Sequence, residues 1–249
     1  MSPRLQFALD LVYQAGRSTL ALFDTGHEVE LKKDNSPVTI ADKAAERIIR
    51  AALQKQFPED GILGEEEGEV GPKERRWVVD PIDGTKSFIC GVPMYATLMS
   101  YEVEGRPELG VCYFPALDHM MYAEIGQGTF FNGRRCRVST QADISRSTLC
   151  CGSHTSMEKY GRDTGFMALA RQSLATRTWS DAYGHALVAR GRVEAMIDPI
   201  VNRWDVSAMQ VIVEEAGGRF TTFSGETNPQ TGAVSTNGVM HERILESFC

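Results

Sequence analysis

The chain has 249 residues, of which 42% are hydrophobic and 24% are charged, as in an ordinary globular protein of one or two domains. Its formal net charge of -7 does not favour nucleic-acid binding, which relies on clusters of lysine and arginine. No apolar run approaches the roughly 18 residues of a membrane span, and the sequence shows no secretory segment and no C-x-x-C pair. We therefore expect a cytoplasmic protein with free thiols and with no nucleic-acid or membrane partner.

Hydrophobic periodicity predicts two helices followed by strands in the first half of the chain. Apolar residues recur at helical spacing over residues 4–23. A second helix begins near Thr39, where Thr39-x-x-Asp42 resembles a capping box, and it ends at Pro58. Short apolar runs then predict strands at 76–80, 95–104, 109–114, 120–124 and 129–131. Asn132-Gly133 is a hairpin signal, and the pattern from 95 to 138 indicates an antiparallel meander.

The second half alternates between helices and strands. Helices are expected at 156–172, 181–190, 205–216 and 238–247, and strands at 193–197, 219–223 and 233–236. This arrangement predicts an α+β fold in which helices cover sheets in layers. We treat residues 1–249 as one domain, with possible subdomains 1–145 and 146–249.

The segment Trp77–Thr85 carries the strongest chemical signal. Its apolar residues predict a strand that delivers Asp80, and Pro81 then stiffens the exit, because its φ is fixed. Asp80 and Asp83 flank a tight turn and can converge on one cation, with the backbone carbonyl of Ile82 as a further oxygen ligand. Gly84 and Thr85 would open a helix, whose free N–H groups can bind an anion. The plainer alternative is a capping aspartate in an ordinary strand-to-helix turn.

Two further acidic motifs become significant when they are considered together with Trp77–Thr85. Taken alone, Gly64-Glu65-Glu66-Glu67-Gly68 predicts a solvated turn, and Asp205 predicts a helix cap. Two metal ions about 3.5–4 Å apart can bind phosphate oxygens, lower the pKa of the attacking water and neutralise the leaving alkoxide. Such a site needs several carboxylates, and Glu65, Asp80, Asp83 and Asp205 together supply them.

The three motifs, with Glu214-Glu215-Ala216-Gly217-Gly218, resemble the inositol monophosphatase family in order and spacing over nearly the whole chain. The resemblance implies a layered α-β-α-β-α sandwich of the inositol monophosphatase and fructose bisphosphatase type. It also implies a Mg²⁺-dependent phosphomonoesterase that holds two to three Mg²⁺ (Mn²⁺ being possible), is inhibited by lithium and forms a homodimer.

The resemblance also implies a role for each site residue. Glu65, Asp80 and the Ile82 carbonyl would hold the first metal, and Asp80, Asp83 and Asp205 the second. Asp83, Gly84 and Thr85 would bind phosphate. Asp42 would act with Thr85 to activate the attacking water, and Glu65 would reach a weaker third site through water. From the residues alone, Asp42 is only an acid in the first turn of a helix.

Residues 84–91, 178–185 and 197–205 look more like the histidinol-phosphate phosphatase branch than the inositol branch. Asp181 and Asp198 would form an acidic pocket for the alcohol, which suits cationic histidinol better than a neutral polyol. Arg203 joins the expected substrate-binding set, although it would repel a cation unless it turned away or paired with an acid. The alternatives are an inositol or broad sugar-alcohol monophosphatase, a capping role for Asp181, and a binder without catalysis.

Overall fold

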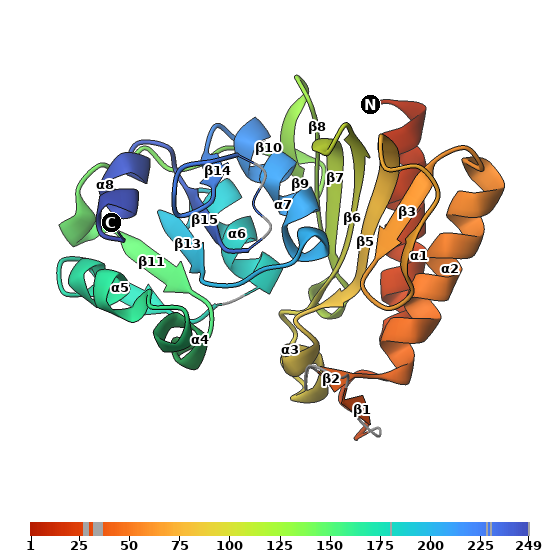
Figure 1. Ribbon diagram of the computed structural model, residues 1–249, viewed down its shortest axis with the longest axis horizontal. Coiled ribbons are helices and arrows are strands. Elements are labelled where there is room, and N and C mark those ends of the chain that lie inside the picture. Colours follow the sequence, from red (N-terminus) through yellow and green to blue (C-terminus); the bar gives the residue numbers. More distant parts are fainter. Residues whose placement is uncertain (27–29, 32–36, 180, 228, 230, 249) are drawn as a thin grey trace.

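The two larger sheets in the described part of the structure, a computed structural model, alternate with three layers of helices in the order helix, sheet, helix, sheet, helix (Figure 1). The structure describes residues 1–26, 30–31, 37–179, 181–227, 229 and 231–248. This arrangement confirms the predicted α+β class and the layered sandwich. Within the described residues, no helix is both long enough and apolar enough to span a bilayer.

The large sheet has the strand order β10-β9-β8-β7-β6-β5-β3-β4. Its strands are β3 (Gly61–Gly64), β4 (Gly68–Val70), β5 (Arg75–Asp83), β6 (Ala96–Val103), β7 (Arg106–Phe114), β8 (His119–Glu124), β9 (Gly128–Phe131) and β10 (Arg134–Cys136). The run from β6 to β10 is the predicted antiparallel meander, and β5 also pairs antiparallel with β6. Its last turn is the predicted two-residue hairpin, in which Asn132 and Gly133 both have positive φ, at 46° and 74°.

One strand pairing in the large sheet is parallel, and it builds the site. β3 runs parallel to β5 with Gly64 opposite Val79, and the Glu65 N–H donates to the Val79 carbonyl at 3.3 Å. Parallel neighbours end at the same edge of a sheet, so Glu65 and Asp80 leave their strands side by side.

Helices α1 (Pro3–Thr19) and α2 (Ile40–Gln56) cover the outer face of the large sheet. Their apolar residues pack on buried side chains of the sheet such as Trp77 and Met99. The predicted capping box at the start of α2 is present, since Thr39 and Asp42 bind each other's backbone N–H groups. It fixes the first turn of α2 beneath the Gly84–Thr85 turn.

Helices α6 (Asp181–Ala189) and α7 (Arg203–Glu215) fill the middle layer. Residues 206–213 of α7 are all buried, because both sheets pack against this helix. Gly110 on β7 permits this close packing, since a Cβ there would lie 2.5 Å from the Ala208 carbonyl oxygen. The layer therefore holds the N-terminus of α7, with Asp205, against the large sheet.

The small sheet has the order β12-β11-β13-β15-β14 and is covered on its outer side by three helices. These elements are β11 (Thr148–Cys151), β12 (Ala175–Arg177), β13 (Ala195–Asp198), β14 (Arg219–Thr221), β15 (Ala233–Thr236), α4 (His154–Lys159), α5 (Asp163–Ala170) and α8 (His241–Glu246). The helix expected at 156–172 is thus two helices, because Gly161, with a φ of 66°, separates α4 from α5.

The remaining short elements are β1 (Glu30–Leu31), β2 (Pro37–Val38), α3 (Thr85–Ile89) and the 3₁₀ helices η1 (Pro115–Leu117) and η2 (Ile144–Arg146). Of these, α3 is the helix predicted to open at Gly84-Thr85. Gly84 precedes it with a φ of 80°, which is the left-handed conformation that favours glycine.

Candidate active site

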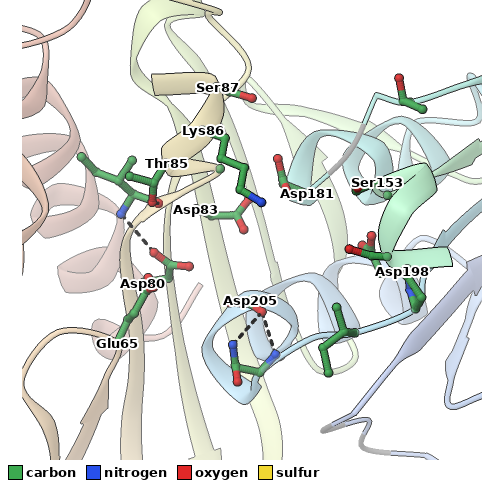
Figure 2. A pocket seen from close by; sticks show the side chains of 18 residues that line it. Glu65, Asp80, Asp83, Thr85, Lys86, Ser87, Ser153, Asp181, Asp198 and Asp205 are labelled. Carbon is green, nitrogen blue, oxygen red and sulfur yellow. Dashed lines mark hydrogen bonds between the residues drawn. The ribbon is translucent and has the colours of Figure 1, made fainter. Parts of the chain in front are cut away.

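A cavity of about 420 Å³ opens where the ends of β3 and β5 face the first turns of α6 and α7 (Figure 2). The predicted site residues that line it are Glu65, Asp80, Ile82, Asp83, Gly84, Thr85, Asp181, Asp198 and Asp205. Segments far apart in the sequence therefore meet in one hollow. Asp42 and Arg203 are the two predicted residues that do not line it.

Three carboxylates form the centre of the cavity. Asp80 and Asp83 come from the end of β5 and Asp205 from the first turn of α7, and one oxygen of each lies within 4.8 Å of the others. The Asp80 carboxylate accepts a hydrogen bond from the Ile82 N–H at 3.0 Å, which tightens the turn between the two acids. The Asp205 carboxylate accepts from the Asn202 N–H at 2.7 Å. Asp205 thus closes a capping box and faces the cavity as well, with Asn202 as the actual N-cap.

These acids repel one another in a buried place. Burial, and then the negative charges of Glu65 and Asp83, raise the pKa of Asp80 well above its usual range. Burial, and then Asp181 and Asp205, do the same to the pKa of Asp83. Burial and the charge of Glu65 raise the pKa of Asp205 to about 7, although the backbone hydrogen bond at its carboxylate opposes the shift. Full ionisation at neutral pH therefore needs a compensating cation, and an all-oxygen donor set suits a hard divalent ion such as Mg²⁺.

Thr85 connects the cavity to α2. Its hydroxyl lies 3.5 Å from Asp42 Oδ1 and 3.2 Å from the Ile82 carbonyl oxygen. Asp42 is fully buried, and its other oxygen accepts hydrogen bonds from the Thr39 N–H at 2.7 Å and the Thr39 hydroxyl at 2.6 Å. Burial raises the pKa of Asp42, while the Thr39 hydrogen bonds oppose the shift. Asp42 thus reaches the cavity through Thr85.

Asp181 and Asp198 lie on the wall of the cavity that faces Glu65 and Asp80, as Figure 2 shows. The first N–H of α6 after Asp181, that of Ala182, donates to Asp83 Oδ2 at 2.7 Å, so a carboxylate of the first half binds a helix of the second. Asp198 ends β13, and its Oδ2 lies 3.1 Å from Nε2 of the buried His185.

His185 is a residue that the sequence interpretation missed. Its Nδ1 lies 2.7 Å from the Ser235 hydroxyl, so the ring is held at both nitrogens. It also lines a recess of about 50 Å³ beside the main cavity. The available signal was its position four residues after Asp181, which places both on one side of a helix. Lys86 was also missed, and it is the only basic side chain among the described residues that line the main cavity.

Contrary to expectation, Arg203 does not lie with the predicted substrate-binding residues. Its guanidinium is buried and binds Glu102 through Nε, Gln210 Oε1 at 3.2 Å and the Gly105 carbonyl oxygen at 3.3 Å. Glu102 is itself fully buried on β6. Arg203 therefore anchors the start of α7 to the large sheet and leaves the acids of the cavity without its charge.

Comparison with known proteins identifies the family and agrees with the fold. The chain matches the inositol monophosphatase family over residues 1–249. It is 41% identical to a histidinol-phosphatase of Chlorobaculum parvum, covering 100% of this chain and 97% of that one. It is 36% identical to a fructose-1,6-bisphosphatase/inositol-1-monophosphatase of Thermotoga maritima, covering 98% and 94%.

Among solved structures, a Thermotoga maritima IMPase superposes with a TM-score of 0.91 at 32% identity, covering 99% of this chain and 97% of that chain. The match in fold therefore extends over the same full length as the match in sequence. The chain belongs to the inositol monophosphatase family.

Proposed function

We propose that the protein is a Mg²⁺-dependent phosphatase that hydrolyses histidinol phosphate to histidinol and phosphate. The observation that carries this proposal is the continuity of the acids in one cavity. The cluster of Asp80, Asp83 and Asp205 passes directly into Asp181 and Asp198, while Arg203 is turned away. Membership of the family supports the phosphatase chemistry, and the second pair of acids supports a cationic alcohol.

The metal ligands in this proposal are Glu65, Asp80, the Ile82 carbonyl, Asp83 and Asp205, for two to three Mg²⁺. Burial first, and then repulsion between the acids, raises the pKa of Asp80, Asp83 and Asp205, and this supports the assignment. When bound, Mg²⁺ supplies Lewis-acid stabilisation of the phosphate charge and a lower pKa for the attacking water.

Thr85 orients the attacking water in this proposal. Its hydroxyl is anchored by Asp42, which Thr39 holds in place, so a lone pair of Thr85 Oγ1 is left to accept from the water. The water oxygen would attack phosphorus and pass its proton through the Thr85 hydroxyl to Asp42. The bond from phosphorus to the alcohol oxygen would break, and the leaving alkoxide would take up a proton from solvent. Gly84, Thr85 and a metal ion bound by Asp83 would hold the phosphate. General-base assistance of this kind typically contributes 10²–10⁴-fold in rate.

The leaving alcohol would lie between Asp181 and Asp198. Histidinol carries an ammonium group and an imidazole, and each can donate charge-assisted hydrogen bonds to a carboxylate. The histidinol-phosphatase of Chlorobaculum parvum, at 41% identity, supports this substrate.

An inositol-1-monophosphatase or a broad sugar-alcohol monophosphatase is the second candidate. Ser153, Ser156 and Thr178 also line the cavity, and neutral hydroxyl groups of this kind suit a polyol. The Thermotoga maritima relatives, with their inositol-phosphatase names, support this alternative.

Phosphate release from histidinol phosphate, inositol 1-phosphate and glycerol 2-phosphate, with Mg²⁺ and with EDTA, tests the proposal. One charge-assisted hydrogen bond contributes about 1.5–3 kcal/mol, so kcat/KM should favour histidinol phosphate over inositol 1-phosphate by about ten- to a hundredfold. Asp181→Ala should reduce that preference while sparing glycerol 2-phosphate. Glu158→Ala, which removes an exposed acid of α4, is the matched control. Equal kcat/KM for histidinol phosphate and inositol 1-phosphate would refute the proposed specificity. Phosphate release in EDTA would refute the proposed metal dependence.

A further inference from the structure

A single buried carboxylate ties the turn that carries Glu65 to helix α2. Glu46 on α2 is fully buried, and its Oε2 accepts a hydrogen bond from the Glu66 N–H at 2.8 Å. Its Oε1 accepts from the Glu67 N–H at 3.0 Å. These are the two peptide groups that directly follow Glu65. A carboxylate that binds consecutive N–H groups fixes the path of the backbone. Glu46 therefore fixes the backbone position from which the Glu65 side chain extends.

Arg50 completes this attachment one helical turn later. Its Nε donates to Glu46 Oε1 at 2.7 Å, and its Nη2 donates to the Gly68 carbonyl oxygen. Arg50 is buried as well, so each of the two charges has the other as its neighbour. We call Glu46 and Arg50 the α2 clamp. The clamp binds the turn between β3 and β4 at its beginning, through Glu46, and at its end, through Arg50.

The first glycine of the Gly64–Gly68 motif makes room for the clamp. A Cβ at Gly64 would lie 2.2 Å from Glu46 Oε1 and 2.8 Å from Arg50 Nη2. Gly68 is there for another reason, since its φ is +70° and nothing lies within 4 Å of the position of a Cβ. The motif thus contains one glycine for the turn conformation and one for close contact with a buried acid.

The clamp shares one side of α2 with a residue already placed at the site. Asp42, Glu46 and Arg50 are spaced four apart, so they lie along one face of the helix. Asp42 holds Thr85 after β5, and Glu46 holds the turn after β3. One helix therefore supports both strand ends from which the acids of the cavity emerge.

We propose that Glu46 is a positioning residue for the divalent cation. It contacts neither cation nor substrate, and it sets the affinity of the site by fixing the turn that presents Glu65. This inference rests on the metal role of Glu65 in the proposed function. Groups that orient metal ligands typically change metal affinity by 10–100-fold when they are replaced.

Two variants that disturb the clamp from opposite sides test this inference. Glu46→Gln keeps one acceptor oxygen and places an amide NH₂ at the position of the other, where at least one backbone N–H of the turn requires an acceptor. Gly64→Ala leaves both charges in place and pushes a methyl group against the Glu46 carboxylate. Glu59→Gln, the same change at an exposed residue just after α2, is the matched control.

Mn²⁺ binding is measured on the intact protein by electron paramagnetic resonance of free Mn²⁺. Both clamp variants should bind Mn²⁺ about 10–100-fold more weakly than the wild type. Their circular dichroism spectra should match that of the wild type, which shows that they fold. The Mg²⁺ concentration for half-maximal phosphate release should rise in parallel, and kcat at saturating Mg²⁺ should fall much less. Glu59→Gln should match wild type in each measurement.

Mn²⁺ affinities within about twofold of wild type in the folded variants would overturn the inference. If Glu46→Gln does not fold, Gly64→Ala decides, and loss of folding in both would show that the clamp acts on stability instead. A wild-type protein that binds no Mn²⁺ would overturn the proposed metal site itself, which is a separate outcome.

Discussion

Replacing Asp205 with asparagine should stabilise the metal-free protein, and only above the acid range of pH. The pKa of this carboxyl group rises from 3.8 to about 7 on folding, chiefly through burial. A group with a raised pKa binds more protons in the folded state, so the folded state loses stability as pH increases from the unfolded value to the folded one. Asparagine carries no charge and escapes this loss.

The magnitude follows from the shift. At about 1.4 kcal/mol per pKa unit, the full cost of ionising Asp205 above pH 7 is at most roughly 4 kcal/mol. Burial is the largest part of this cost, and repulsion by the charge of Glu65 adds to it. The loss of one acceptor at the capping box subtracts about 0.5–1 kcal/mol. We expect a net gain of about 1–3 kcal/mol at pH 8, and none near pH 4, where the carboxyl group is protonated in the folded state.

Urea unfolding in EDTA at pH 4 and pH 8 measures this gain. Asp10→Asn, at an exposed position on α1, is the control for a general change in net charge. Added Mg²⁺ should stabilise the wild type strongly and Asp205→Asn weakly, because the variant lacks one ligand of the cluster. A variant that is less stable than wild type at pH 8, or that differs from it equally at both pH values, would refute the reasoning.

Two further substitutions test the walls of the cavity. Thr85→Ala should lower kcat by about 10²–10⁴-fold and change KM much less, because it removes the group that orients the water. Steady-state kinetics with saturating Mg²⁺ measure this effect. An unchanged kcat would show that Thr85 has no role in catalysis. His185→Leu should reduce the preference for histidinol phosphate over glycerol 2-phosphate about tenfold. The reason is that Asp198 loses its buried hydrogen-bond donor, His185, which contributes about 1–2 kcal/mol. A preference equal to that of the wild type would show that His185 acts in packing alone.

The parts of the fold that could be predicted are those whose cause is local in the sequence. The capping box at Thr39 and the hairpin at Asn132-Gly133 each depend on neighbouring residues, and both are present. β3, β4, β11 and β12 have only three or four residues each and were not anticipated. The strand conformation of β3 and β11 depends on partners farther along the chain, β5 for β3 and β12 and β13 for β11, and β4 then pairs with β3. Periodicity within so short a segment carries no such information.

The same distinction explains the site. Asp80 and Asp83 could be paired from the sequence because a tight turn joins them. Arg203 was assigned to the substrate-binding set, yet it stands two residues from Asp205, and residues two apart lie on different faces of a helix. Its partner, Glu102, lies on a strand a hundred residues earlier, and no local pattern could reveal that contact.

The hydrogen bond between Asp83 and the first turn of α6 spans the seam between the two halves of the chain, as does the acidic cluster that Asp83 shares with Asp205. A divalent cation bound in that cluster would therefore be a non-covalent cross-link between the large sheet, through Asp80 and Asp83, and helix α7, through Asp205. Cation binding and docking of the halves are reciprocally linked, so each must strengthen the other. Loading with the ion should merge their unfolding into a single cooperative transition. Without the ion, the electrostatic repulsion among the three acids would oppose the docking of α7 on the large sheet.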